Sequence, residues 1–194
     1  MTAPGDSQSI REILDFWFLP LDDPEHGKPR EIWWKSTPEH DDEIRRRFGV
    51  LVDRAIAGDL DAWRKSPDGA LAVVILCDQF TRNIHRRTAR AYSGDAKARE
   101  TARLALARHY PAAYPPDMQT FFYTPFHHSE ELGDQELCCA LFAGLEREGG
   151  DKYAVGHRNI VARFGRFPHR NAVLGRESTA EELEFLKAAE RYGQ

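Results

Sequence analysis

The chain has 194 residues, which is enough for one domain with a sizeable hydrophobic core. Its hydrophobic fraction of 41% and charged fraction of 30% are typical of a soluble globular protein. The formal net charge of −4 argues against nucleic acid as the main partner, because binding to a phosphate backbone needs a basic surface. The longest apolar run, from Ala70 to Cys77, is too short to span a bilayer, so we expect no membrane association.

Three cysteines lie in apolar runs: Cys77, Cys138 and Cys139. An odd number of cysteines in such surroundings indicates reduced core thiols and not a disulfide framework. The first ten residues lack the cationic segment and following apolar run that mark a signal peptide. We therefore expect a cytoplasmic protein.

The first half of the chain shows helical periodicity. Apolar residues three and four positions apart form one stripe before Pro20, and these are Ile10, Ile13, Leu14, Trp17 and Phe18. Thr37 and Pro38 predict the start of a second helix, as a capping hydroxyl followed by proline at the first helical position. Gly58 predicts the end of that helix.

The segment Ala70–Phe80 is apolar on all sides until Asp78, a pattern that fits either a buried strand or a buried helix. Its helical neighbours and the lack of partner strands favour a central buried helix. Further helices are expected over residues 95–109, from Pro125 to about Leu145, and from Lys152 to about Arg163.

The last expected helix begins with a capping box formed by Thr179 and Glu182, and it has Leu183 and Leu186 as its core residues. No strand or hairpin pattern is convincing anywhere in the chain. Short connections between the helices favour antiparallel helix pairs. The sequence therefore predicts a single all-α domain over residues 1–194, built of stacked antiparallel helix hairpins.

The first candidate functional segment runs from Asp78 to Asn83. Asp78 ends a long apolar run and needs a partner, because a lone desolvated carboxylate is costly. Arg82 is the nearest candidate, four residues later on a continuing helix. Asn83 can cap the helix end or hydrogen-bond into a cleft. A structural ion pair that closes a buried helix and a role in a pocket are about equally supported.

The second candidate segment follows Pro125. On a helix that starts there, ionisable side chains occupy the face that later turns fill with apolar residues, and they are His127, Glu130 or Glu131, and Asp134. A histidine paired with a glutamate suits acid–base chemistry, and we assign this catalytic role to His128 and Glu130. The alternative is a structural role, with both residues bound to arginines. We expect no metal, because neither HExxH nor paired Glu-x-x-His turns are present.

The third candidate segment, residues 157–176, is the basic tract, with five arginines, two histidines and no acidic residue. Phe164 and Phe167 can anchor a loop that holds the neighbouring polar side chains in fixed directions. Guanidinium groups on such a loop suit two-point recognition of phosphate or carboxylate. The residues that we predict to bind ligand here are Arg163, Arg166, His169, Arg170 and Asn171.

The same arginines can also pair with acids inside the fold, namely Asp78, Glu130 and Asp134. Five arginines exceed three acids, which favours a spare cationic group for a ligand. RNA binding by an arginine-rich segment is opposed by the acidic balance of the rest of the chain.

Several stretches together resemble one bacterial family. They are LDFWF (14–18), AGDLDAW (57–63), LCDQFTRNIHR (76–86), TPFHHSE with Gln135 (124–135) and the stretch 157–186. In this order, and over nearly the whole chain, they are similar to the family called domain of unknown function 924. The resemblance implies an all-helical, tetratricopeptide-like fold, and it implies no activity, because the family has no established biochemical role. His127 stands where the family more often has an acid, which weakens a catalytic assignment at this position.

We expect one concave surface that binds a small anionic ligand bearing phosphate or carboxylate. Three segments would supply its side chains: Asp78, Arg82 and Asn83, then His128 and Glu130, then the five residues of the basic tract. Hydrolase or transferase chemistry would use His128 and Glu130, and the sequence leaves open whether the protein is an enzyme. The alternatives are a tetratricopeptide-like module that binds peptides and a polar cluster that only cross-links helices. No cofactor is expected.

Overall fold

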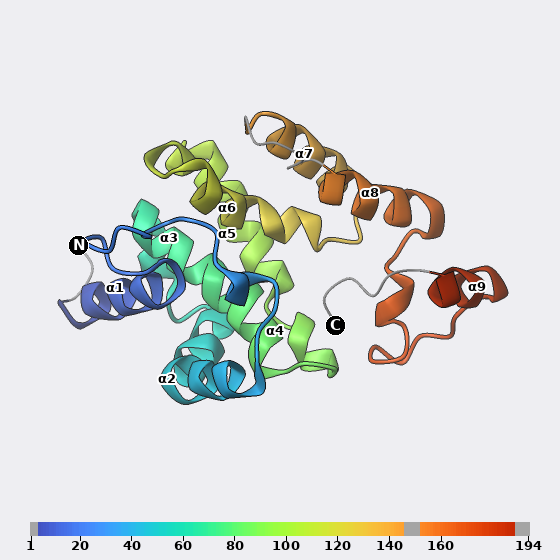
Figure 1. Ribbon diagram of the computed structural model, residues 1–194, viewed down its shortest axis with the longest axis horizontal. Helices are drawn as coiled ribbons and strands as arrows, with labels where there is room; N and C mark the ends of the chain where they lie inside the picture. Colours follow the sequence, from blue (N-terminus) through green and yellow to red (C-terminus); the bar gives the residue numbers. More distant parts are fainter. Residues whose placement is uncertain (1–3, 146–151, 189–194) are drawn as a thin grey trace.

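The computed structural model describes residues 4–145 and 152–188, and within these ranges the chain forms helices and no strands (Figure 1). The α-helices are α1 (Pro4–Phe18), α2 (Pro38–Ala57), α3 (Pro67–Val74), α4 (Thr81–Ile84), α5 (Asp95–Ala107), α6 (Pro116–His127), α7 (Leu132–Ala143), α8 (Lys152–Phe164) and α9 (Ala180–Ala188). Short 3-10 turns link them at Glu31–Trp33, Asp61–Lys65, Ala89–Tyr92, Tyr110–Ala113 and Pro168–Arg170. The all-α prediction is confirmed, whereas tetratricopeptide-like stacking and a single domain stay predictions.

Local signals place the ends of helices α2 and α9. The Thr37 hydroxyl accepts a hydrogen bond from the backbone N–H of His40, and Gly58 ends α2 in a left-handed conformation with φ of 90°. At α9, the Glu182 carboxylate accepts from the Thr179 backbone N–H, and the Thr179 hydroxyl accepts from that of Glu182. The capping box is therefore confirmed. The expected core role of Leu183 is wrong, because this side chain is 51% exposed.

The apolar segment before Asp78 is the buried helix that we expected, although it is not a regular one. Helix α3 continues into a π-helical turn, Ile75–Phe80, and then into α4 without a break in the helical backbone. The Thr81 hydroxyl donates to the carbonyl of Leu76, five residues earlier, at 2.8 Å. Wide turns of this kind often occur at functional sites. Here the π turn carries Asp78.

Pro125 does not begin a helix, contrary to the prediction. It lies inside α6, in the last turn of this helix and two residues before its end at His127. Proline has no N–H for the carbonyl of Phe121, four residues earlier. The Thr124 hydroxyl donates to that carbonyl at 3.1 Å and so satisfies it. The chain breaks later, over residues 128–131, and α7 starts at Leu132.

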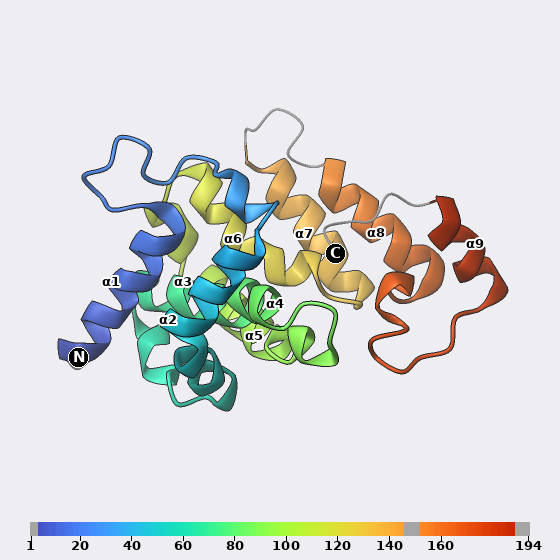
Figure 2. The same cartoon turned by 60° about the horizontal axis from the view of Figure 1, so that its bottom comes forward.

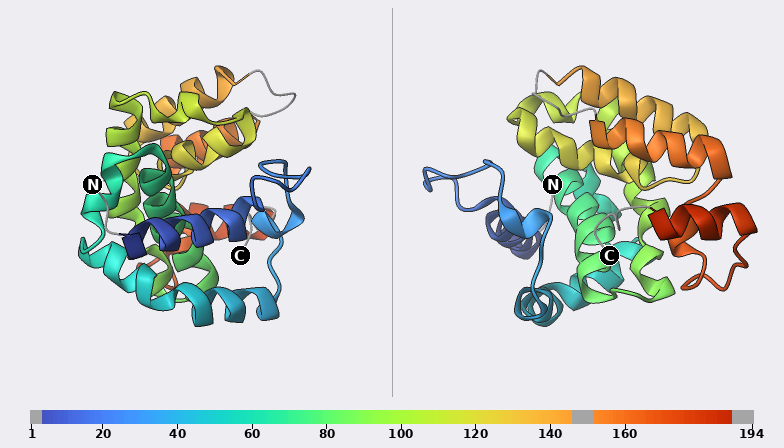
Figure 3. Two further views of the ribbon diagram at one scale, coloured as in Figure 1. Left: turned by 90° about the vertical axis from the view of Figure 1, so that its left-hand side faces the viewer. Right: turned by 45° about the vertical axis from the view of Figure 1, so that its right-hand side comes forward.

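Helices α3 and α5 lie in the middle of the molecule, with α1 and α2 on one side and α6 to α8 on the other (Figures 1 and 2). The core between them is aromatic, with fully buried rings from Trp17, Phe18, Phe48, Phe80 and Phe121. The basic tract and α9 form the end of the molecule farthest from α1 (Figures 1 and 3). None of the described helices combines the length and apolar character needed to cross a membrane.

Candidate functional site

Asp78 is a fully buried carboxylate with partners from three directions. Its Oδ1 accepts from Nδ1 of His128 at 2.8 Å and from Nη1 of Arg82 at 3.1 Å, and its Oδ2 accepts from the side-chain amide of Gln79. Burial alone would raise the pKa of Asp78, but His128 and Arg82 hold it well below its ordinary value. The carboxylate is therefore ionised at neutral pH inside the core.

Arg82 joins two acids from different segments. Its Nη1 also donates to the backbone carbonyl of Asp78 at 2.7 Å, and its Nη2 lies 3.0 Å from Oδ1 of Asp95. Asp95 is the first residue of α5, where the helix dipole favours an acid. The predicted pairing of Asp78 with Arg82 is confirmed, and α5 adds a second carboxylate that the sequence analysis did not assign.

Arg170 lies on the other side of Asp95 and is only 6% exposed. Its guanidinium carbon is 4.7 Å from the ring centre of Tyr92 and 4.5 Å from that of Phe167, which hold the group between them. Its Nη1 donates to the backbone carbonyl of His128 at 2.9 Å. Burial and repulsion by other cations lower the pKa of Arg170 to about 10, so it stays charged at neutral pH. Within residues 4–145 and 152–188, nothing accepts a hydrogen bond from its Nη2.

The contact with Asp78 determines which nitrogen of the His128 ring carries the proton. Because the carboxylate only accepts, Nδ1 of His128 carries the proton, and Nε2 keeps its lone pair. Burial and the nearby Arg82 lower the pKa of His128, so the ring is neutral at physiological pH. No described residue bonds to Nε2.

Beside this ring lies a small cavity of about 260 Å³, which we call the His128 hollow. It is bordered by the start of α5, the break between α6 and α7, and the loop after Pro168–Arg170. The lining residues are Tyr92, Asp95, Arg99, His128, Ser129, Glu130, Glu131, Arg170 and Leu174.

Glu130 does not form the acid–base pair with His128 that we predicted. Both of its oxygens are bound by Arg176, at 2.6 and 2.9 Å, and Oε1 also accepts from the backbone N–H of Phe167 at 2.8 Å. These hydrogen bonds and the Arg176 charge outweigh burial and lower the pKa of Glu130. An ionised carboxylate with three donors is suited to holding the loop and not to exchanging a proton.

Asp78, Arg82 and His169 do not line this hollow themselves, and four other predicted ligand-binding residues are held by partners away from it. Arg163 binds Glu181 at 2.7 Å, and Arg166 binds Glu182 at 2.6 Å, so both turn toward α9. The Asn171 side chain is buried among Ser178, Glu182 and Arg176. The Asn83 amide donates to Asp41 at 2.7 Å. The expected convergence on one surface is wrong for these four residues, because each has an acidic partner elsewhere.

His169 lies near the hollow, within a group of histidine and phenylalanine rings. Its ring centre is 5.5 Å from that of Phe167, which in turn is 5.4 Å from that of His157. The His157 and His127 ring centres are 3.8 Å apart. Burial lowers the pKa of His169 and of His157 to about 4. Among the described residues, no group of three or more His, Cys, Asp or Glu side chains is placed to hold a metal ion.

A larger cavity, of about 470 Å³, lies on the far side of Tyr92, and we call it the arginine hollow. Its lining includes Arg82 and Asn83 from the predicted set. It also includes residues that the sequence analysis missed, among them Asp41, Asp42, Arg45, Arg86 and Arg87. These residues come from α2 and the loop after α4, and no local pattern in the sequence links the two segments.

The chain matches a family model and a solved structure of similar fold. A family model described as "Bacterial protein of unknown function (DUF924)" matches residues 13–190. A solved structure of a protein of unknown function from Agrobacterium tumefaciens is 36% identical, with a TM-score of 0.85, over 94% of this chain and 99% of that one. Comparison with curated proteins gives no match. Because the family model spans nearly all of its length, this chain belongs to the bacterial DUF924 family, as its motifs predicted.

Proposed function

We propose that the protein binds a small anionic substrate in the His128 hollow and that His128 acts there as a general base. The observation that carries the proposal is the hydrogen bond from Nδ1 of His128, a residue that lines the hollow, to the buried Asp78 carboxylate, which leaves Nε2 with its lone pair and with no partner among the described residues. A histidine oriented by a carboxylate in this way is a recurring means of accepting a proton near neutral pH.

The surroundings of His128 suit both the uptake of a proton and its later release. The neutral ring can take a proton from water or from a hydroxyl group of the substrate. Asp78 then stabilises the imidazolium that forms, and the ring can return the proton to a leaving group. This role fits hydrolysis or group transfer. In this proposal Glu130 holds the loop in place through its ion pair with Arg176, and it takes no part in the proton exchange.

In this proposal the Arg170 guanidinium binds the anionic group of the substrate. Its charge persists at neutral pH, the rings of Tyr92 and Phe167 fix its direction, and its Nη2 is not engaged by any described residue. A guanidinium held in this way loses little freedom on binding a carboxylate or phosphate. The volume of about 260 Å³ limits the ligand to a small metabolite.

The first test is the ionisation state of His128, measured by nitrogen NMR of the imidazole rings. We expect a neutral ring at pH 7 with the proton on Nδ1, and Asp78→Asn should change this tautomer distribution. A ring that is cationic at pH 7, or that carries its proton on Nε2, would contradict a role as base.

The second test is ligand binding by thermal shift with acetate, glycolate, inorganic phosphate and glycerol phosphate. A ligand that binds only the folded state raises Tm. Arg170→Lys should reduce any ligand-induced rise in Tm that the wild type shows. The control variant His109→Asn should show the same rise as the wild type. His109 is exposed beyond the far end of α5, and asparagine tolerates its left-handed backbone. A flat response to all four anions would count against the anionic substrate.

A further inference from the structure

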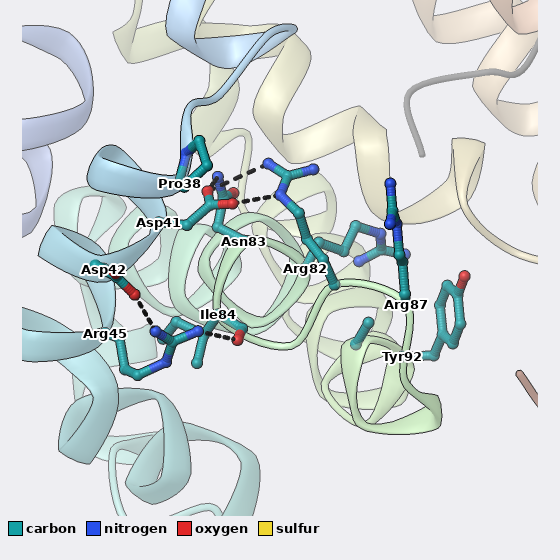
Figure 4. A pocket seen from close by; sticks show the side chains of 11 residues that line it. Pro38, Asp41, Asp42, Arg45, Arg82, Asn83, Ile84, Arg87 and Tyr92 are labelled. Atoms are coloured by element: carbon teal, nitrogen blue, oxygen red, sulfur yellow. Dashed lines mark hydrogen bonds and ion pairs between the residues drawn. The ribbon is translucent and has the colours of Figure 1, made fainter.

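The arginine hollow is separate from the His128 hollow, although Tyr92 borders both. Figure 4 shows Asp41 and Asp42 on one side of it and Arg87 and Tyr92 on the other. The walls combine guanidinium groups with apolar surface, and the apolar part comes from Pro38, Ile84, Ala91 and the Tyr92 ring.

Three of its four arginines are held by carboxylates. Arg45 pairs with Asp42 and donates to the backbone carbonyl of Ile84 at 2.8 Å. Arg86 binds both oxygens of Asp41. Arg82 is neutralised by its ion pairs with Asp78 and Asp95, which do not line the hollow. These contacts fix the positions of the guanidinium groups, and each group keeps N–H donors that the contacts do not use.

Arg87 differs from the other three. No described residue forms an ion pair or hydrogen bond with it, and its backbone has a φ of 60°, which residues other than glycine rarely adopt. With Arg82 neutralised by its own acids, the hollow has Arg45, Arg86 and Arg87 against Asp41 and Asp42. One positive charge is therefore left without a partner inside the described residues, and it belongs to Arg87.

We propose that the arginine hollow binds a small organic phosphate monoester, with the phosphate on Arg87 and Arg86 and the organic part against Tyr92 and Ile84. Guanidinium groups from several directions match the tetrahedral oxygens of a phosphate better than the planar oxygens of a carboxylate. The volume of about 470 Å³ exceeds what a free phosphate ion fills and lies within the range of small-molecule sites. The apolar walls supply the contact surface for an organic group.

The test uses phenyl phosphate as the probe, because it joins a phosphate monoester to a flat apolar ring. Binding is measured at pH 7.5 by amide chemical-shift titration of the full chain. We expect saturable shifts at Asn83, Ile84 and Ala91, which border the hollow. Arg87→Gln should weaken binding by about ten- to a hundredfold, which is the loss of one charge-assisted hydrogen bond.

Arg46→Gln is the matched control, because Arg46 is an exposed arginine next to Arg45 on α2 and does not line the hollow. This variant should keep the wild-type Kd. The proposal would be overturned by the lack of saturable shifts up to about 10 mM phenyl phosphate, by equal affinity in Arg87→Gln, or by equal affinity for benzoate. Shifts that centre on Ser129 and Leu174 would also overturn it, since they border the His128 hollow.

Discussion

Glu130 and Arg176 form a two-point ion pair, with Nη1 and Nη2 of the guanidinium 2.6 and 2.9 Å from the two carboxylate oxygens. The pair joins the break between α6 and α7 to the end of the basic tract. Glu130 also binds the backbone N–H of Phe167, whose ring packs against Arg170. The pair thereby fixes the loop that places Arg170 beside His128.

Removing the Glu130 carboxylate should therefore loosen this loop. We expect Glu130→Ala to lower the free energy of unfolding by about 2 kcal/mol, because Arg176 and the Phe167 N–H lose their acceptor. Urea denaturation measures the change. The control is Glu181→Ala, which removes an exposed pair with Arg163 and should cost less than about 0.5 kcal/mol. Equal losses in the two variants would contradict the central role of Glu130.

Replacing the buried Asp78 carboxylate should lower the free energy of unfolding more than replacing an acid at the surface. Asp78→Asn leaves the cation at Arg82 with less compensation inside the core, and we expect a loss of about 3 kcal/mol in unfolding free energy. Asp53→Asn is the comparison, because Asp53 pairs with Arg90 at the surface, where both side chains are more than half exposed. If chemical denaturation gives Asp78→Asn a stability within about 0.5 kcal/mol of the wild type, the Asp78 network contributes far less than its geometry indicates.

Gly94 allows the start of α5 to approach the π turn closely. A Cβ added at Gly94 would clash with the backbone carbonyl oxygen of Cys77. This clash cannot be relieved by a side-chain rotation, because the oxygen belongs to the backbone. We expect Gly94→Ala to destabilise the fold by about 2 kcal/mol or more and to move Asp95 away from Arg82.

Gly133→Ala provides the control for this effect. Gly133 lies in the first turn of α7, and a Cβ there would meet nothing within 4 Å. Alanine should therefore leave stability unchanged or raise it by up to about 1 kcal/mol, since it is the better helix former. Thermal unfolding of both variants measures the contrast. A well-folded Gly94→Ala variant with unchanged Tm would show that the close approach is not required.

The histidine rings around Phe167 should make the protein less stable in mild acid. The pKa of His157 and of His169 is about 4 in the folded chain, against 6.5 for the free side chain, so the unfolded chain binds more protons between these values. Their contribution to stability is complete above about pH 6.5 and is lost as the pH falls toward 4. We expect a loss of roughly 1 to 2 kcal/mol for each ring by pH 5.

Urea denaturation at pH 7.5 and pH 5 tests this expectation. His157→Gln should reduce the difference between the two pH values, because glutamine does not titrate. Equal stability of the wild type at both pH values would mean that these rings are not desolvated in the folded state.

Much of the fold could be predicted because its signals are local. The caps at Thr37 and Thr179 bond to N–H groups three residues away, and Gly58 ends a helix by its own backbone freedom. The prediction failed at Pro125, because the interior position of this proline depends on a hydroxyl contact that its sequence pattern does not reveal. The π turn at Asp78 was missed because apolar periodicity does not distinguish it from an α-helix.

The candidate site was only partly predictable for a different reason. The sequence alone determined that Asp78 needed a buried partner and that Arg82, one turn away, could be that partner. Only the packing of α6 against the central helices brought His128 to Asp78, 50 residues away, and only the position of α9 drew Arg163 and Arg166 to its acids. Local spacing specifies helices, because their hydrogen bonds join residues four apart. A charge instead takes whichever opposite charge the packed helices place within a few ångströms, and the order of residues along the chain does not encode that distance.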